Sequence, residues 1–410
     1  MTLLPFWLLM NVISDSHASS RLFQIYDLSL MISKCDEHKP TCQKCSGIGT
    51  PCSYLQTYRL KKDLPNAPTK LSSQTQTLSL ESFSSSQLHS NLPPSFTMLD
   101  LKILHFWTTS SELNFNNNQS GAELFRITFV EIALEYPFLM HEILSLSGLH
   151  LAYTKPNQAD IYRDAAVIHH AKALSLFQPQ IANLTSENCH ACFAFSTILS
   201  VLTWAFQSSD DTSNPFFKFE SPAEPEYAQI QWMKVHRGSH AVIDAAWPWI
   251  EIGPLSPLLR PWKGLSASDP TPLPLPEKTH LDALAETWNT RSAHQPSVPV
   301  AQKEILEATL QTLRRVFSIS NTSAEIGRPA ATIAWMTLIP MEFVQMTEEM
   351  IPEALLILAH YCVLLKRMEY LWWVKGKAYN LLQAIRNALG DGWERWLQWP
   401  IDEVTSTRSE

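Results

Sequence analysis

The sequence lacks the short motifs by which many enzyme classes can be recognised. It contains no GxxxxGK[ST] or GxGxxG loop for phosphate groups and no GxSxG turn for a nucleophilic serine. Its carboxylates are scattered, and none of them form a recognisable pair. The sequence therefore gives no positive reason to expect an enzyme.

Glycine and charged residues are both scarce, with 11 glycines in 410 residues and 17% charged residues against 45% hydrophobic ones. A chain of this length and composition can bury a large core, and its length suggests two to three domains. A convincing membrane span is also missing. Residues 191–206 are too short, and charged side chains interrupt residues 354–374. We interpret both stretches as buried core helices.

Cysteine is sparse, and four of the seven lie between Cys35 and Cys52. An odd, clustered count favours reduced thiols and a metal over a disulfide framework, and hence an intracellular protein. The net charge is −8, yet residues 34–62 carry six basic side chains against two acidic ones. A small basic module on an acidic body is typical of a nucleic-acid reader tethered to a regulatory domain. The other interpretation is a merely solvated loop.

The cysteine cluster has the spacing C-x6-C-x2-C-x6-C, formed by Cys35, Cys42, Cys45 and Cys52. A CxxC pair brings two thiolates to one small, soft ion, and flanking cysteines at loop distance can complete a tetrahedral shell. The pattern therefore predicts Zn²⁺.

This pattern resembles the second half of the binuclear zinc cluster of fungal transcription factors, in which six cysteines hold two zinc ions. Besides the cysteines, Lys34 and the Lys39-Pro40 pair fall on the family's positions. The resemblance implies a nuclear transcription regulator, with double-stranded DNA and the transcription machinery as partners. It also implies that Lys34 touches a DNA phosphate.

The first half of the motif is missing from this sequence. The family's first two cysteines should lie where this chain has Ile25 and Leu28, and only Lys34 of its basic run is present. The absent basic residues are the ones that reach base edges in the family, so we expect impaired DNA binding. The four cysteines are one ligand short for either family site, but they can close one rearranged four-sulfur site. We hypothesise that residues 1–33 are not the native start of the gene product; a secretory signal over residues 1–20 is the alternative.

Residues 54–95 are rich in serine, threonine, glutamine and proline, which predicts a disordered linker between the zinc-cluster segment at 34–53 and the rest of the chain. From residue 96 to 400, apolar residues recur at helical spacing, which predicts an all-α regulatory domain; residues 401–410 form a tail. Pro137 should begin a helix. The expected helices cover 98–115, 122–136, 137–153, 158–178, 188–207, 227–247, 278–288, 300–318, 331–347 and 353–389.

The helical part resembles the regulatory region of the branch that includes the sterol uptake control proteins. The likeness rests on LKILHFWTTSSEL with YPFLMHEILSLSGLHLA, on WMKVHRGSHAVIDAAWPWIEIGPLSPLL, and on IPEALLILAHYCVLLKRMEYLWWVKGKAYNLLQAI. It implies a domain that binds a sterol or another apolar ligand. His360, Tyr361, Tyr370, Trp372 and Trp373 are expected on one helix, where they suit either an apolar pocket or ordinary core. The sequence assigns no ligand residues.

Two further patterns resemble metal or redox motifs. His236 and His240 lie four residues apart, but no glutamate completes a metalloprotease motif and Gly238 weakens the helix between them. Cys189 and Cys192 form a CxxC that opens an apolar helix. We interpret both pairs as structural. The leading interpretation is the zinc-dependent transcription regulator. The alternatives are a non-DNA-binding helical sensor or interaction protein with a vestigial cysteine segment, or a secreted helical protein.

Overall fold

The fold consists of helices packed around two buried central ones. The computed structural model describes residues 96–110, 119–206, 218–219, 228–229, 231–263, 265, 272–289 and 298–406. All of them belong to one of the chain's two compact units. Within it the prediction of an all-α domain is confirmed. The predicted segments at 1–33, 34–53 and 54–95 lie outside the described residues.

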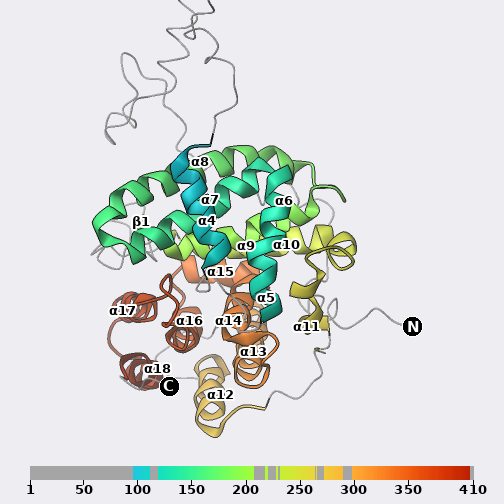
Figure 1. The fold of residues 1–410 in the computed structure, drawn as a ribbon. Coiled ribbons are helices and arrows are strands. Elements are labelled where there is room, and N and C mark those ends of the chain that lie inside the picture. The colour runs from blue at the N-terminus through green and yellow to red at the C-terminus, as the bar shows by residue number, and fades with distance from the viewer. Residues whose placement is uncertain are drawn as a thin grey trace, which may run out of the picture. The chain divides into compact units, whose positions relative to one another are not determined.

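The first group of elements is centred on α7, which contacts α4, α6, α8 and α9 (Figure 1). Pro137 occupies its first turn as predicted, and nearly every residue from Phe138 to Ala152 is buried. A helix that is apolar all round needs neighbours on every side, which explains this central place. The elements are α4 (Met98–Thr109), α5 (Gln119–Glu123), a π-helical segment η2 (Leu124–Thr128), α6 (Phe129–Glu135), α7 (Pro137–Thr154), η3 (Pro156–Gln158), α8 (Ala159–Ala182) and α9 (Cys189–Ala205).

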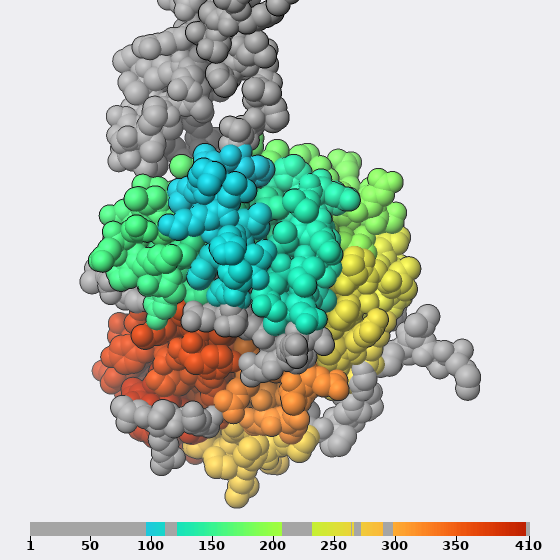
Figure 2. Space-filling view, in the orientation of Figure 1, coloured from blue at the N-terminus to red at the C-terminus, as the bar shows by residue number. Residues whose placement is uncertain are grey.

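Helix α4 begins at a capping box. The Thr97 hydroxyl accepts a hydrogen bond from the Asp100 amide at 3.2 Å, and the Asp100 carboxylate accepts one from the Thr97 amide at 2.7 Å. The outer face of α4 is exposed, with Met98 at 81% and Leu101 at 52%, whereas Ile103 and Trp107 are fully buried. Figure 2 shows α4 in blue on the molecular surface.

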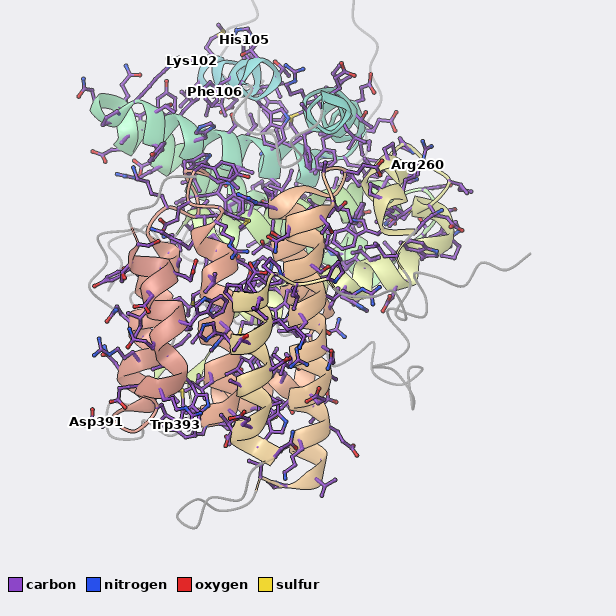
Figure 3. All side chains as sticks on the ribbon, turned by 90° about the horizontal axis from the view of Figure 1, so that it is seen from below. Lys102, His105, Phe106, Arg260, Asp391 and Trp393 are labelled. Atoms are coloured by element: carbon purple, nitrogen blue, oxygen red, sulfur yellow. The ribbon has the colours of Figure 1, made fainter. Side chains whose placement is uncertain are left out.

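The second group is centred on α16, which contacts α12, α13, α14, α15, α17 and α18. Residues Glu353 to Leu365 of α16 are all buried. The turn that carries Asp391 and Trp393, between α17 and α18, lies at the opposite end of the described helices from α4 (Figure 3). The remaining elements, in chain order, are α10 (Gln231–Ile250), η4 (Ser256–Leu258), α11 (Arg260–Lys263), α12 (Leu275–Asn289), α13 (Val300–Thr322), α14 (Gly327–Leu338), α15 (Met341–Glu348), α16 (Pro352–Lys366), α17 (Lys377–Leu389) and α18 (Glu394–Thr405).

Two predicted helices are each broken in two. The 331–347 helix is interrupted at Pro340, because the residue before a proline is pushed out of the helical region, and Ile339 has ψ 147°. The 353–389 helix ends at Lys366 and resumes at Lys377, and turns fill the gap. Gly376, with φ +76°, precedes the new helix in a conformation that L side chains rarely adopt.

The described strands are a minimal exception to the helical architecture. β1 (Lys218–Phe219) pairs antiparallel with β2 (Ala228–Gln229), so that Lys218 lies opposite Gln229. Among the described helices none is both long and apolar enough to cross a membrane. The stretches at 191–206 and 354–374 are buried inside the helical unit for most of their length.

Candidate ligand pocket

The residues predicted to hold zinc and to touch DNA lie outside the described part of the chain. They are Lys34, Cys35, Cys42, Cys45 and Cys52. Their donor chemistry fits the metal, because four cysteine thiolates are a common ligand set of structural zinc sites. Their assignment as zinc ligands and as a phosphate contact stays a prediction.

Within the described helices an apolar cavity of about 170 Å³ lies between α9, α10, α11 and α14. Its apolar wall consists of Phe125, Phe193, Val201, Ile243, Leu258, Leu259, Pro261, Trp262, Ile326, Ala330, Ile333, Ala334 and Leu338. Its polar lining residues are Ser196, Thr197, Ser200, Ser239, Glu325 and Thr337. A mostly apolar, partly enclosed space with a few polar groups is typical of a site for a small ligand.

The cavity exists because small side chains line helices that pack closely. α10 contacts both α9 and α14. Ser196 and Ser200 lie one turn apart on α9, and Ala330 and Ala334 lie one turn apart on α14. Larger residues at these positions would fill the space, since protein interiors are otherwise packed without gaps of this size. Arg260, labelled in Figure 3, marks the start of α11 between the lining residues Leu259 and Pro261.

The serines of the cavity form a small hydrogen-bonded cluster. The Ser200 hydroxyl donates to the Ser196 carbonyl at 3.0 Å, and the Ser239 hydroxyl lies 3.3 Å from the same carbonyl. The two hydroxyl oxygens are 3.1 Å apart. Thr197 and Thr337 donate in the same way to carbonyls one turn back, Phe193 at 3.0 Å and Ile333 at 3.3 Å. The hydroxyl protons of the lining are thus used within the protein, while the oxygens keep lone pairs.

One wall of the cavity comes from an irregular helix. Phe125 lies in the π-helical segment η2, a helix type found often at functional sites. Its main-chain carbonyl accepts a hydrogen bond of 2.9 Å from the buried indole nitrogen of Trp107 on α4. The cavity wall is therefore fixed directly to the first described helix of the chain.

The histidine pair of α10 lies near the serine cluster, and each imidazole has its own partner. Trp204 donates its indole N–H to His236 Nε2 at 2.7 Å, which places the imidazole proton on Nδ1. Burial lowers the pKa of His236 to about 3, so the ring is neutral. His240 Nδ1 lies 2.8 Å from the carboxylate of Asp244. The two rings thus point to different groups, and among the described residues no three His, Cys, Asp or Glu are arranged to hold a metal ion.

The CxxC pair of α9 is buried. Cys189 Sγ donates to the Ser186 carbonyl at 3.3 Å. Burial raises the pKa of Cys192 to about 12, and it raises the pKa of Cys362 as well. These thiols stay protonated at neutral pH and pack as small apolar residues.

The aromatic residues predicted on one helix do not share one. His360 and Tyr361 lie in α16, whereas Tyr370, Trp372 and Trp373 fall in the turns after it, so this expectation was wrong. Tyr361 stacks on Trp335 at 4.5 Å and donates to the Thr332 carbonyl at 3.2 Å.

Three other members of that set also have their own surroundings away from the cavity. His360 packs 5.4 Å from Trp399, Trp372 stacks on His150 at 4.9 Å, and Tyr370 is 60% exposed. None of the five residues lines the cavity, so those that are buried form ordinary core.

Sequence reasoning missed the cavity because its wall is assembled from segments far apart in the chain. A local signal did exist in α9, where Ser196, Thr197 and Ser200 interrupt an otherwise apolar helix at helical spacing. A hydroxyl group inside an apolar helix either donates a hydrogen bond to a carbonyl of its own helix or lines a cavity. Here they do both.

Comparison with known protein families gives two matches in this chain. Residues 33–61 match the fungal Zn(2)-Cys(6) binuclear cluster domain. Residues 103–216 match the fungal specific transcription factor domain, which includes α9 and the π-helical wall of the cavity. The first match contains Lys34 and all four clustered cysteines.

Individual relatives agree with these matches. The chain is 23% identical over 425 residues to a Zn(2)-C6 fungal-type transcription factor of Gibberella zeae, covering 90% of this chain and 82% of that protein. It is 26% identical over 218 residues to the transcription factor afumD of Aspergillus fumigatus, covering 52% and 51%. Sterol uptake control protein 2 of Candida albicans is 26% identical over 191 residues, or 46% of this chain and 24% of that protein.

Proposed function

We propose that this chain, a transcription factor of the fungal Zn(2)-Cys(6) type and not an enzyme, couples an apolar ligand in its helical domain to DNA-bound transcription control. The family implies zinc, DNA binding and work in the nucleus. The observation that carries the ligand part is the cavity of about 170 Å³ between α9, α10, α11 and α14. A relative whose name is a sterol uptake control protein supports an apolar ligand.

The zinc part of the proposal rests on Cys35, Cys42, Cys45 and Cys52. The cluster match begins at Ser33, and the sequence has no cysteine before Cys35. Four thiolates suffice for one tetrahedral ion, so the proposal assigns one Zn²⁺ per chain. Lys34 then supplies a phosphate contact, and base reading is weakened because the residues before it are uncharged from Ser29 to Ser33.

The regulatory part rests on how the cavity is joined to α4. We place the zinc-cluster segment at 34–53, the linker at 54–95 and the regulatory domain at 96–400, so α4 is the helix nearest the linker in sequence. A ligand that contacts Phe125 shifts the π-helical segment whose carbonyl Trp107 holds. A ligand can act as a switch only if it binds more tightly when α4 is in one position than when α4 is in another.

Zinc content and salt-dependent DNA binding test the first part. The purified full chain should carry about one zinc per chain, and Cys42→Ser with Cys45→Ser should remove it. Cys362→Ala, which removes a buried thiol of α16, is the matched control and should keep the zinc. Affinity for promoter fragments should fall as salt rises, because displaced counterions supply much of the binding energy. A chain without zinc, or a chain with zinc but without salt-dependent DNA affinity, would overturn the proposed zinc-dependent DNA binding.

The second candidate function is a helical sensor that does not bind DNA. The missing basic run favours it, because Lys34 alone carries charge where the family has several basic residues. The same titration separates the two, since a sensor shows no DNA affinity at any salt concentration yet still binds an apolar ligand.

A further inference from the structure

From the lining of the cavity we infer that its ligand is a small apolar alcohol or phenol, with one or two rings and one hydroxyl group. This inference rests on the proposed ligand function and names the chemistry of that site. It differs from sterol binding, which the name of the Candida albicans relative suggests.

The size of the cavity sets the first limit. Its volume is about 170 Å³. A cavity of about 150 Å³ lined by leucine, isoleucine and phenylalanine holds one benzene ring. A molecule with one or two rings therefore fills this space, whereas a sterol, with four fused rings and a side chain, is larger and would have to extend through the open side of the cavity.

The hydroxyls of the lining set the second limit. Ser200 and Ser239 use their protons on the Ser196 carbonyl or on each other, at 3.0 to 3.3 Å. Their oxygens keep unused lone pairs, so the cluster accepts hydrogen bonds and has no free proton to donate. A ligand hydroxyl supplies the donor that the cluster lacks, and a ketone or an ether does not.

Charge sets the third limit. Among the lining residues Glu325 is the charged one, and no lysine, arginine or histidine lines the cavity. Glu325 is exposed, and a fatty acid or another carboxylate would find no cation among the lining residues to compensate its charge in the apolar part of the site. A neutral hydroxyl with an apolar body, packed against Phe125 and Trp262, satisfies all three limits.

The test compares thymol, a ten-carbon phenol, with p-cymene, the same molecule without the hydroxyl, and with ergosterol. Calorimetry on the full chain should show thymol binding about three- to tenfold more tightly than p-cymene, the effect of one net hydrogen bond. The double variant Ser200→Ala and Ser239→Ala should bring the two affinities together. Ser175→Ala, an exposed serine on α8, is the matched control and should leave the difference unchanged.

Ala334→Leu provides a second, independent variant, because its added carbons point into the cavity and should weaken both thymol and p-cymene. Equal affinities of thymol and p-cymene for the unmodified chain would overturn the hydroxyl inference. Ergosterol binding that Ala334→Leu abolishes would overturn it too, but would leave the proposed ligand function standing. If none of the three probes binds, the proposed ligand function fails along with the inference.

Discussion

Trp107 donates its indole N–H to the main-chain carbonyl of Phe125 at 2.9 Å, and this bond joins α4 to the irregular helix that lines the cavity. Trp107 is fully buried. A main-chain carbonyl oxygen has two lone pairs. The Phe125 carbonyl can therefore accept the hydrogen bond from Trp107 even when its own helix uses one of them.

We expect Trp107→Phe to lower the free energy of unfolding by about 2 to 4 kcal/mol, because it removes both the donor and part of a buried ring. Trp396→Phe is the control: its indole nitrogen has no hydrogen-bond partner among the described residues, so its cost should be about 1 kcal/mol. Urea unfolding measures both. If α4 transmits ligand binding, Trp107→Phe should also uncouple reporter activity from the ligand while calorimetric binding persists.

A second prediction concerns the ion pair that joins α12 to the turn after α16. Arg367 Nη2 lies 2.6 Å from Glu277 Oε1, and Asn321 donates to the other carboxylate oxygen at 2.9 Å. Both charged side chains are largely buried. Arg367→Met should cost about 3 kcal/mol, because it leaves the Glu277 carboxylate without its cation.

The double variant Arg367→Met with Glu277→Gln should recover part of that loss, since the buried charge is then removed on both sides. Lys278→Met, which breaks the exposed pair with Asp282 at 2.7 Å, is the control and should change stability by about 0.5 kcal/mol or less. Equal losses for the two single variants would show that burial of the Arg367 pair carries no energetic weight.

The sequence predicts a helix well where the helix buries one apolar face or is buried on all sides. Helices α7, α9 and α16 are apolar nearly all round, and each is buried as that pattern requires. Proline correctly predicted the start of α7, whereas the prediction of one helix over 331–347 followed the periodicity and overlooked the break that Pro340 causes.

Other features depend on tertiary contacts that no local pattern contains. The segment after Lys366 has helical spacing, yet Trp372 leaves the helix to stack on His150 of α7, and Gly376 permits the reversal. The cavity likewise needs Phe125, Ser200, Trp262 and Ala334 to meet from four separate elements. Periodicity reports which side of a helix is buried, but not which other helix covers it.

Two glycines give a contrasting pair of predictions. A Cβ added at Gly148 of α7 would lie 3.1 Å from the Tyr162 carbonyl oxygen and 3.3 Å from Ala166 Cβ, both on α8. Gly148→Val should therefore cost about 1 to 3 kcal/mol by overpacking this contact. A Cβ at Gly238 of α10 meets nothing within 4 Å, so Gly238→Ala should stabilise the fold by about 0.5 to 1 kcal/mol. Thermal unfolding should move in opposite directions for the two variants.

The last prediction concerns acid. Burial lowers the pKa of His236 from 6.5 to about 3, and protonation would set an N–H against the indole N–H of Trp204. Between pH 6.5 and about 3, His236 is protonated in the unfolded chain and neutral in the folded chain. The contribution of His236 to stability is therefore complete above pH 6.5 and is lost as the pH falls toward 3, by up to about 1.4 kcal/mol per pH unit. The half-buried His141 and the buried His360, with pKa values of about 4, act in the same direction.

His236→Gln isolates this effect, because its side-chain oxygen can accept the hydrogen bond from Trp204 but does not titrate. We expect its free energy of unfolding, measured in urea at pH 7, 6 and 5, to fall less steeply than that of the unmodified chain, by up to about one proton's worth of slope. If the free energies of unfolding of His236→Gln and the unmodified chain fell in parallel with pH, His236 would be protonated in the folded state. The hydrogen bond from Trp204 would then not keep the imidazole neutral.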